Sequence, residues 1–173
     1  MKKYATLSKD LTTLSEEINT YLANYRFIYA NYALDMYHPI GFTEDLESDI
    51  PSIKNSFTSE NLTVKGIGHL AVNNTPIAIP AKNSLLLVPI KDVTSCKLDI
   101  CEANEGATAH HDATFDYLFY DVEDCTSTTV IENITDPILI NAGTINAIVN
   151  TGEATAHFAI VSFNEDISSY FAD

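Results

Sequence analysis

The feature that most constrains this chain is a period of two in its apolar residues, which runs from about residue 62 to residue 163. Successive side chains of a β-strand point to opposite faces, so this period predicts strands that bury one face. Short segments with this pattern, about seven or eight in number, are separated by Asn, Gly, Pro and Asp. The spacing predicts a mainly β protein, a sandwich or barrel, with a jelly roll as the leading candidate.

A helical segment precedes these strands. Residues 6–24 predict one amphipathic helix, because their apolar residues recur at steps of three and four. The positions that form this stripe are Leu7, Leu11, Leu14, Ile18 and Tyr21.

Residues 21–42, the tyrosine-rich segment, hold seven aromatic side chains. Such side chains are enriched at protein interfaces. We therefore expect Tyr25, Tyr29 and Tyr32 to contact another chain, in an oligomer or an assembly. Packing of the same rings against the sheet is the alternative interpretation.

The length of 173 residues predicts a single domain, residues 1–173. Within it, residues 1–45 form the N-terminal helix and tyrosine-rich part, and residues 46–173 form the β part. The apolar fraction of 46% suits a folded core.

The charge balance limits the partners. Lys plus Arg number 9 and Asp plus Glu number 24, for a net charge of −15. Such a surface repels nucleic acid and anionic membranes, so we expect neither as a partner. Protein partners or self-association remain, although simple solubility explains the charge equally well. The first residues lack the apolar run of a signal peptide, so we expect a cytoplasmic protein that is not secreted.

Three segments from residue 76 onward carry a resemblance to a known family. They are "PIAIPAKNSLLLVPI" (residues 76–90), "LINAGTINAIVN" (139–150) and "HFAIVSF" (157–163). In order and spacing they resemble the double-stranded β-helix of iron(II)/2-oxoglutarate-dependent dioxygenases. The likeness is to the small aspartyl/asparaginyl-hydroxylase-like versions of tailed phages. It implies a jelly-roll scaffold over residues 49–163.

At the positions where that family has its metal-binding residues, this chain has residues that cannot bind iron. The resemblance places its His-x-Asp pair at Ala78 and Pro80, and its distal histidine at Asn146. An iron(II) site of this kind needs two imidazoles and a carboxylate, which these residues cannot supply. Lys82 stands where the family has a basic residue, and His157 stands near the co-substrate arginine. The resemblance thus implies a site without catalytic residues, metal or cofactor.

Our hypothesis is a non-catalytic jelly-roll protein that acts as a structural or interaction module, as a component of a phage virion. The alternative is an active hydroxylase that uses Fe(II) and 2-oxoglutarate with relocated ligands, His110, Asp112 and His157. Against it, the polar residues around His110 predict an exposed loop. A metal-free small-molecule binder that uses the barrel mouth is a third hypothesis. Cys96 and Cys101 fall in opposite strand phases, which argues against a redox pair.

Overall fold

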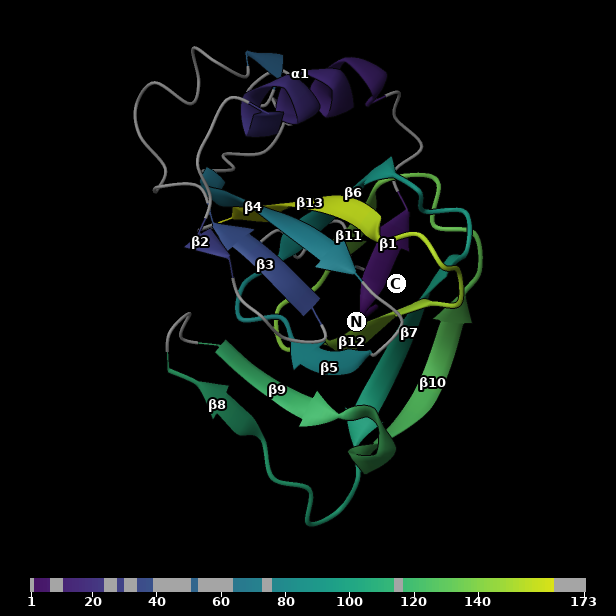
Figure 1. Cartoon of the computed structure of the whole chain (residues 1–173). Coiled ribbons are helices and arrows are strands. Elements are labelled where there is room, and N and C mark those ends of the chain that lie inside the picture. Colours follow the sequence, from purple (N-terminus) through teal and green to yellow (C-terminus); the bar gives the residue numbers. More distant parts are fainter. Residues whose placement is uncertain are drawn as a thin grey trace.

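The computed structural model describes residues 2–6, 11–23, 28–29, 34–38, 51–52, 64–72, 76–113 and 117–163. Two antiparallel sheets face each other, and a helix covers the outer face of one of them (Figure 1). The elements are β1 (Tyr4–Thr6), α1 (Thr12–Ala23), β2 (Ile28–Tyr29), β3 (Leu34–His38), β4 (Val64–Val72), β5 (Ile77–Pro80), β6 (Leu85–Lys91), β7 (Cys96–Ala103), β8 (His110–Asp112), β9 (Tyr117–Asp121), a 3₁₀ turn (Val122–Asp124), β10 (Cys125–Ile131), β11 (Ile138–Ile140), β12 (Ile145–Asn150) and β13 (Ala156–Phe163).

The strand order is that of a double-stranded β-helix. The large sheet runs β1-β11-β6-β13-β4-β3-β2, and the small sheet runs β10-β7-β12-β5-β9-β8. From β4 to β7, and again from β10 to β13, consecutive strands alternate between the two sheets. The β8–β9 pair is inserted between these two series at the edge of the small sheet. The structure confirms the predicted mainly β, jelly-roll fold with an N-terminal helix.

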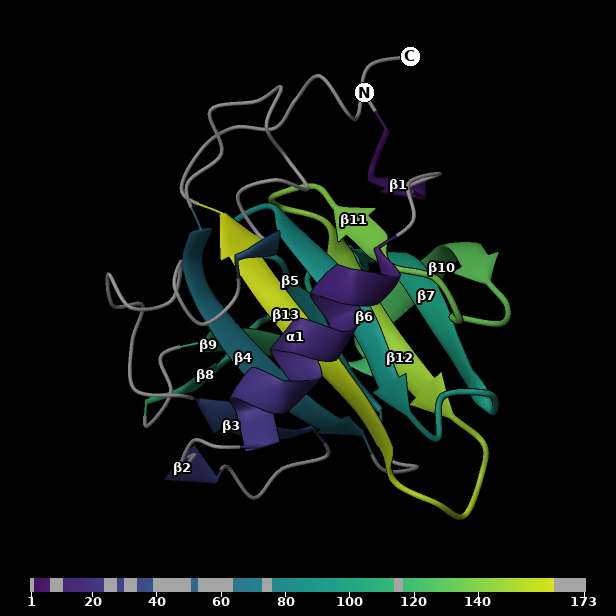
Figure 2. The ribbon, with the colours of Figure 1, turned by 90° about the horizontal axis from the view of Figure 1, so that it is seen from above.

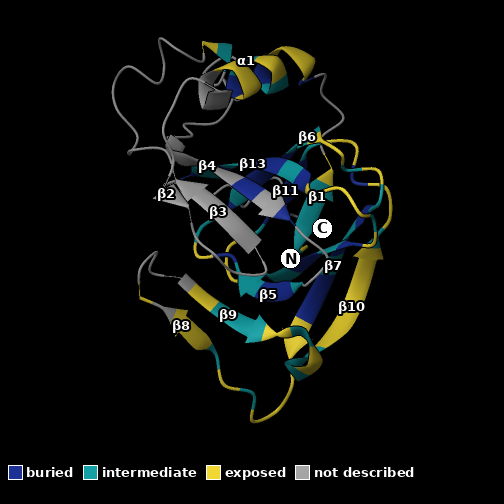
Figure 3. Cartoon of the chain, viewed as in Figure 1, coloured by how far each residue is buried: buried dark blue, intermediate teal, exposed yellow. Residues whose placement is uncertain are grey.

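The main core fills the space between the sheets. In the large sheet Leu87 on β6 lies opposite Ile138 on β11 and Ile160 on β13. In the small sheet Leu98 on β7 lies opposite Ile148 on β12. Figure 3 shows the buried residues concentrated in these central strands, with β10 almost wholly exposed. The alternation of buried and exposed positions along the strands follows the period of two in the sequence.

The helix covers the other face of the large sheet, where it lies across β6 and β13 (Figure 2). Its buried side chains Leu14 and Ile18, with Leu11 directly before the helix, confirm the central part of the predicted stripe. They meet the outward phase of the sheet, which is also buried: Leu86, Val88, Leu139, Ala159, Val161 and Phe163. Among the described residues no helix has the length and apolar character to cross a bilayer.

The predicted start of the helix is wrong. Helix α1 begins at Thr12, and Thr6, the first residue of the predicted helix, belongs to β1 instead, while residues 7–10 lie outside the described residues. Tyr4 lies opposite Ile140 and Thr6 opposite Ile138, so β1 extends the large sheet beyond β11. A partner strand about 135 residues away in the chain decides this conformation, as happens when tertiary pairing overrides local pattern.

The Asn/Gly step between β11 and β12 is a tight turn, as the sequence predicts. The amide of Thr144 donates to the carbonyl of Asn141 at 3.1 Å, and Gly143 has a φ of +82°. A residue with a side chain is strained at that φ, so glycine suits this position. The turn is tied to the end of β5, because Ala81 exchanges backbone hydrogen bonds with Gly143 and Thr144.

Asn150, at the end of β12, joins three chain segments. Its side chain is 2% exposed, and its amide nitrogen donates to the carbonyls of Val72 at 3.0 Å and Ala154 at 2.9 Å. Its amide oxygen accepts from the Gly152 amide and the Ser95 hydroxyl. A buried amide is tolerated when its donors and acceptor are satisfied in this way.

We expect Asn150→Ala to lower the free energy of unfolding by about 2–3 kcal/mol, because it removes the buried hydrogen bonds that the Asn150 amide makes to the Val72 and Ala154 carbonyls and to Ser95 and Gly152. Urea denaturation measures this loss. The control is Asn104→Ala, which removes an exposed amide and costs less than about 1 kcal/mol. Equal losses for the two variants would contradict the role assigned to Asn150.

Candidate functional site

The region to which the family resemblance assigns its ligands is the pairing of β5 with β12. Ile145 lies opposite Pro80, and Asn146 lies opposite Ile79. On its other side Asn146 lies opposite Ile100 of β7. Residues directly opposite each other in a sheet point to the same face. Since Ile79 and Ile100 pack in the main core, Asn146 faces the space between the sheets.

Ala78 and Pro80 occupy the other phase of β5. Ala78 is buried in a separate cluster with Cys101 and Ala147, on the face of the small sheet that points away from the large sheet. Pro80 is two residues further on and shares that phase. A former ligand set at these three positions should converge on one point, and this expectation is wrong. The positions lie side by side in the sheet, but Ala78 and Pro80 point to one face and Asn146 to the other. The bulkier Ile77 and Ile79 take the inward phase, where the larger core buries them.

The inward positions offer no ligand set for iron. They carry Ile77 and Ile79 on β5 and Asn146 on β12. The amide nitrogen of Asn146 donates to the carbonyls of Ile79 at 3.0 Å and Thr144 at 3.4 Å, so this side chain bridges β12 to β5. Within the part of the chain that the structure describes, no three His, Cys, Asp or Glu side chains group as a metal site would require.

The relocated ligands His110 and Asp112 lie in β8, the edge strand of the small sheet. The expectation of a loop is wrong there, because His110 pairs with Phe119 and Asp112 with Tyr117 on β9. The Nε2 atom of His110 lies 3.2 Å from the Oδ2 atom of Asp121, and its ring contacts Phe119 with centroids 5.1 Å apart. Both members of this His–carboxylate pair are about half exposed.

His157 lies on β13, in the middle of the other sheet. Its neighbours Ala156 and Phe158 belong to the main core, so the His157 side chain points to the outer face of the large sheet. Figure 1 shows β8 and β13 on opposite sides of the molecule. The structure therefore does not bring His157 together with His110 and Asp112.

The surroundings of His157 favour the neutral form of its imidazole. Its partial burial lowers its pKa below the usual value, the nearby Lys91 lowers it further, and Asp92 partly opposes this. A neutral imidazole cannot grip a carboxylate as the family's arginine does. Lys82, the basic residue expected after the first motif, is exposed in the connection from β5 to β6.

The interaction residues predicted from the tyrosine-rich segment are not tested by the structure. Tyr25 and Tyr32 lie outside the described residues. Tyr29 lies in β2, opposite Tyr37 of β3, and only its backbone is described.

The cysteines confirm the phase argument, since Cys96 packs in the main core and Cys101 in the outward cluster. The thiol of Cys101 instead contacts that of Cys125 on β10. Burial, Asp99 and Cys125 together raise the pKa of Cys101 to about 12. This thiol is therefore protonated at neutral pH and is a poor nucleophile.

Sequence reasoning missed a cleft at the open edge of the sandwich, between β1 of the large sheet and β10 of the small sheet. We call it the N-terminal cleft. The only signal for it was a pair of adjacent lysines in an acidic chain. The cleft has a volume of about 750 Å³ and is lined by Lys2, Lys3, Tyr4, Ala5, Thr6, Ile100, Thr128 and Thr129.

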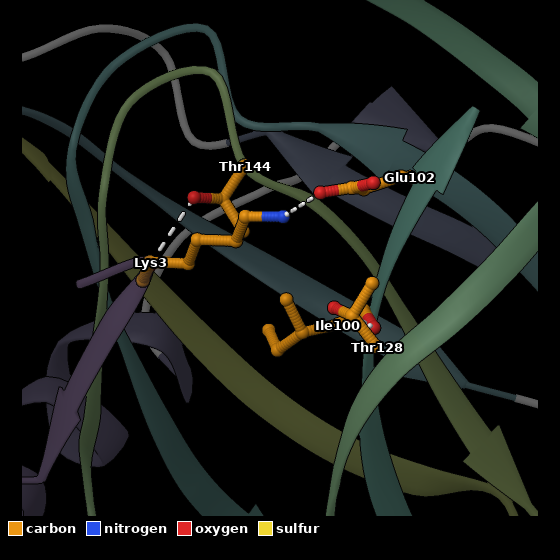
Figure 4. A network of polar contacts seen from close by, with 5 residues as sticks. All are labelled: Lys3, Ile100, Glu102, Thr128 and Thr144. Carbon is orange, nitrogen blue, oxygen red and sulfur yellow. Dashed lines mark hydrogen bonds and ion pairs between the residues drawn. The ribbon is translucent and has the colours of Figure 1, made fainter. Parts of the chain in front are cut away.

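Lys3 bridges the two sheets beside this cleft (Figure 4). Its Nζ atom lies 2.8 Å from Oε1 of Glu102 on β7, and this pairing lowers the pKa of the Glu102 carboxyl. The carbonyl of Lys3 accepts from the hydroxyl of Thr144 at 3.2 Å. Figure 4 also shows Ile100 and Thr128 below the lysine stem.

Comparisons with known proteins show the fold. No family model and no curated protein matches the sequence. The structure is similar to that of the epimerase SnoN in complex with Fe3+, alpha ketoglutarate and nogalamycin RO. The TM-score is 0.52 at 10% identity, over 95% of this chain and 78% of that one. It is also similar to the non-heme alpha ketoglutarate dependent carbocyclase SnoK from nogalamycin biosynthesis. The TM-score there is 0.51 at 9% identity, over 94% of this chain and 80% of that one.

A match to E. coli ycfD has a TM-score of 0.48 at 9% identity and covers 79% of this chain. The chain spans about a third of the length of that protein, 35%. The similarity to SnoN and SnoK, at 10% and 9% identity, establishes the jelly-roll fold alone and leaves the chemistry to the residues of this chain.

The lowered pKa of His157 predicts a pH dependence of stability. The unfolded chain binds the proton more readily than the folded protein, so stability falls as the pH drops below the ordinary histidine pKa of 6.5. We expect His157→Gln to lose less of its free energy of unfolding between pH 7 and pH 5 than the unsubstituted protein. Urea denaturation at the two pH values measures the difference. The same loss in both proteins would show that His157 is not held neutral.

Proposed function

We propose that this chain is a non-catalytic double-stranded β-helix that serves as a structural or interaction module, as a component of a phage particle. The observation that carries the proposal is the composition of the inward face at β5 and β12. That face carries Ile77, Ile79 and Asn146, and the positions to which the resemblance assigned ligands carry Ala78, Pro80 and Asn146. Neither set supplies the two imidazoles and the carboxylate of an iron(II) site.

The same face also lacks the surroundings of a metal site. Ligating imidazoles and carboxylates need further polar groups to orient them. Here the neighbours of Asn146 in the core are Ile79, Ile100 and Ile148. The Asn146 amide itself is engaged with backbone carbonyls on β5 and in the preceding turn. These residues support packing between sheets rather than chemistry.

The alternative function, a hydroxylase with relocated ligands, has less support. His110 and Asp112 lie on the free edge of the small sheet, whereas His157 points outward from the large sheet. A facial triad needs its three ligands around one ion, with open positions for the co-substrate and oxygen.

We expect the purified protein to hold well under one equivalent of iron or manganese at micromolar metal, and not to turn over 2-oxoglutarate. Elemental analysis after anaerobic loading measures the first quantity, and succinate release measures the second. One equivalent of tightly held metal that is lost in His110→Ala or His157→Ala would favour the hydroxylase instead. Lys97→Ala, on the outward phase of β7, is the control for unspecific loss.

We further propose that the tyrosine-rich segment supplies the contact with another chain. The net charge of −15 favours a partner surface that carries positive charge. Aromatic side chains supply apolar area while their hydroxyl groups keep a polar contact, which suits an interface.

We expect the double substitution Tyr29→Ala/Tyr32→Ala to reduce the assembled fraction of the protein, because interface aromatics are frequent binding hot spots. Size exclusion with light scattering measures the mass of the isolated protein, and a pull-down from its native assembly measures partner binding. Leu118→Ser, at an apolar side chain that is 48% exposed on β9, is the control and leaves assembly unchanged. A monomer that captures no partner, and whose stability the double substitution leaves unchanged, would refute the proposal.

A further inference from the structure

The N-terminal cleft lies on one side of the sandwich, between an edge strand of each sheet. β1 is the last strand of the large sheet, and β10 is the last strand of the small sheet. Neither edge strand is covered by a further described strand, so the space between them opens to solvent. This side is distinct from the β5–β12 pairing, where the family resemblance places its chemistry.

The walls of the cleft are built from inward-facing residues. Tyr4 packs against the main core, so the phase of β1 that contains Tyr4 and Thr6 points between the sheets. Ile100, which is 1% exposed, supplies an apolar floor. Thr129 lies opposite Ile100 in the ladder and so shares its face.

A β-bulge brings two threonines to the same cleft. The register of β10 on β7 shifts between Ser127 and Thr129, and both Thr128 and Thr129 then line the cavity. The hydroxyl of Thr128 donates to the carbonyl of Ile100 at 3.0 Å. Within the described part of the chain the hydroxyl of Thr129 makes no such bond. Bulges at sheet edges often redirect a side chain toward a site in this way.

The cleft also carries positive charge in a strongly acidic protein. Two of the 9 basic residues, Lys2 and Lys3, lie at its rim, against 24 acidic residues in the chain. Lys3 is paired with Glu102. The ammonium group of Lys2 forms no hydrogen bond or ion pair with another described residue, so its charge is available to a ligand.

We propose that the N-terminal cleft binds a small organic carboxylate with an apolar body. The Lys2 ammonium and the Thr129 hydroxyl hold the carboxylate, and Tyr4 and Ile100 contact the apolar part. A charged hydrogen bond at the rim and an apolar floor are the usual elements of a small-molecule site, and the volume of about 750 Å³ lies in the usual range. This proposal does not depend on whether the β5–β12 region is catalytic.

The test is a titration followed by two-dimensional NMR of the ¹⁵N-labelled full chain, with any tag at the C-terminus because residues 2–6 line the cleft. The probes are benzoate, its neutral analogue benzamide, and inorganic phosphate. We expect benzoate to shift the amides of Tyr4, Ile100 and Thr129 in a saturable way. Benzamide and phosphate bind more weakly, because one lacks the charge and the other the apolar body.

Two variants assign the binding to the proposed groups. We expect Lys2→Gln to weaken benzoate binding about tenfold, which is the usual scale for a lost charged hydrogen bond. Thr129→Val, of similar shape and without the hydroxyl, weakens it as well. Lys97→Gln is the matched control, since it removes the same charge from the outward phase of β7 and leaves the affinity unchanged.

Four results would overturn the proposal. They are no saturable shift with benzoate, equal affinity for benzamide, phosphate binding as tight as benzoate, and an equal loss in Lys97→Gln and Lys2→Gln. The last would mean that net charge, and not the cleft, attracts the anion.

Discussion

Burial of the two inner sheet faces against each other is the interaction on which this fold depends. Phe158, Leu98 and Ile100 are each at most 1% exposed between the sheets. A side chain of this size contributes about 1.5–3 kcal/mol when it leaves water. The polar groups that remain inside are each bonded, as the Asn146 and Asn150 amides are to backbone carbonyls. A polar ligand set would therefore have to replace part of the contact that stabilises the molecule.

The β5 strand illustrates that competition. An iron(II) site on the inward phase of β5 would require polar ligands there, and binding energy from the metal would have to compensate for the lost apolar contact. In this chain Ile77 and Ile79 fill the same phase and join the core. The similarity to SnoN and SnoK concerns the fold alone, and a shared fold does not imply a shared site.

The period of two predicted most of the central strands and the class of fold, but it did not fix the phase of every strand. The segment "PIAIP" has apolar residues in both phases, so its pattern does not say which residues point inward. A shift of one residue in its pairing would turn every side chain to the opposite face. The pairing of β5 with β12, in which Asn146 lies opposite Ile79, decides which face is inward. β10 was missed because its run of Thr and Ser lacks apolar alternation, and its pairing with β7 holds it in the sheet. β1 and the cleft beside it depend on partners far away in the chain, which a local pattern does not reveal.

The edges of the small sheet bear on how copies of this chain meet. Among the described strands none pairs with the outer edge of β10, and such edges invite pairing with another strand. Two features oppose it here. The bulge near Thr128 distorts the edge, and antiparallel self-pairing centred on that residue would set Asp124 of one copy against Glu132 of the other. Like charges opposite each other destabilise a strand pair. The other edge, β8, is only three residues long. These features disfavour self-association through either edge of the small sheet.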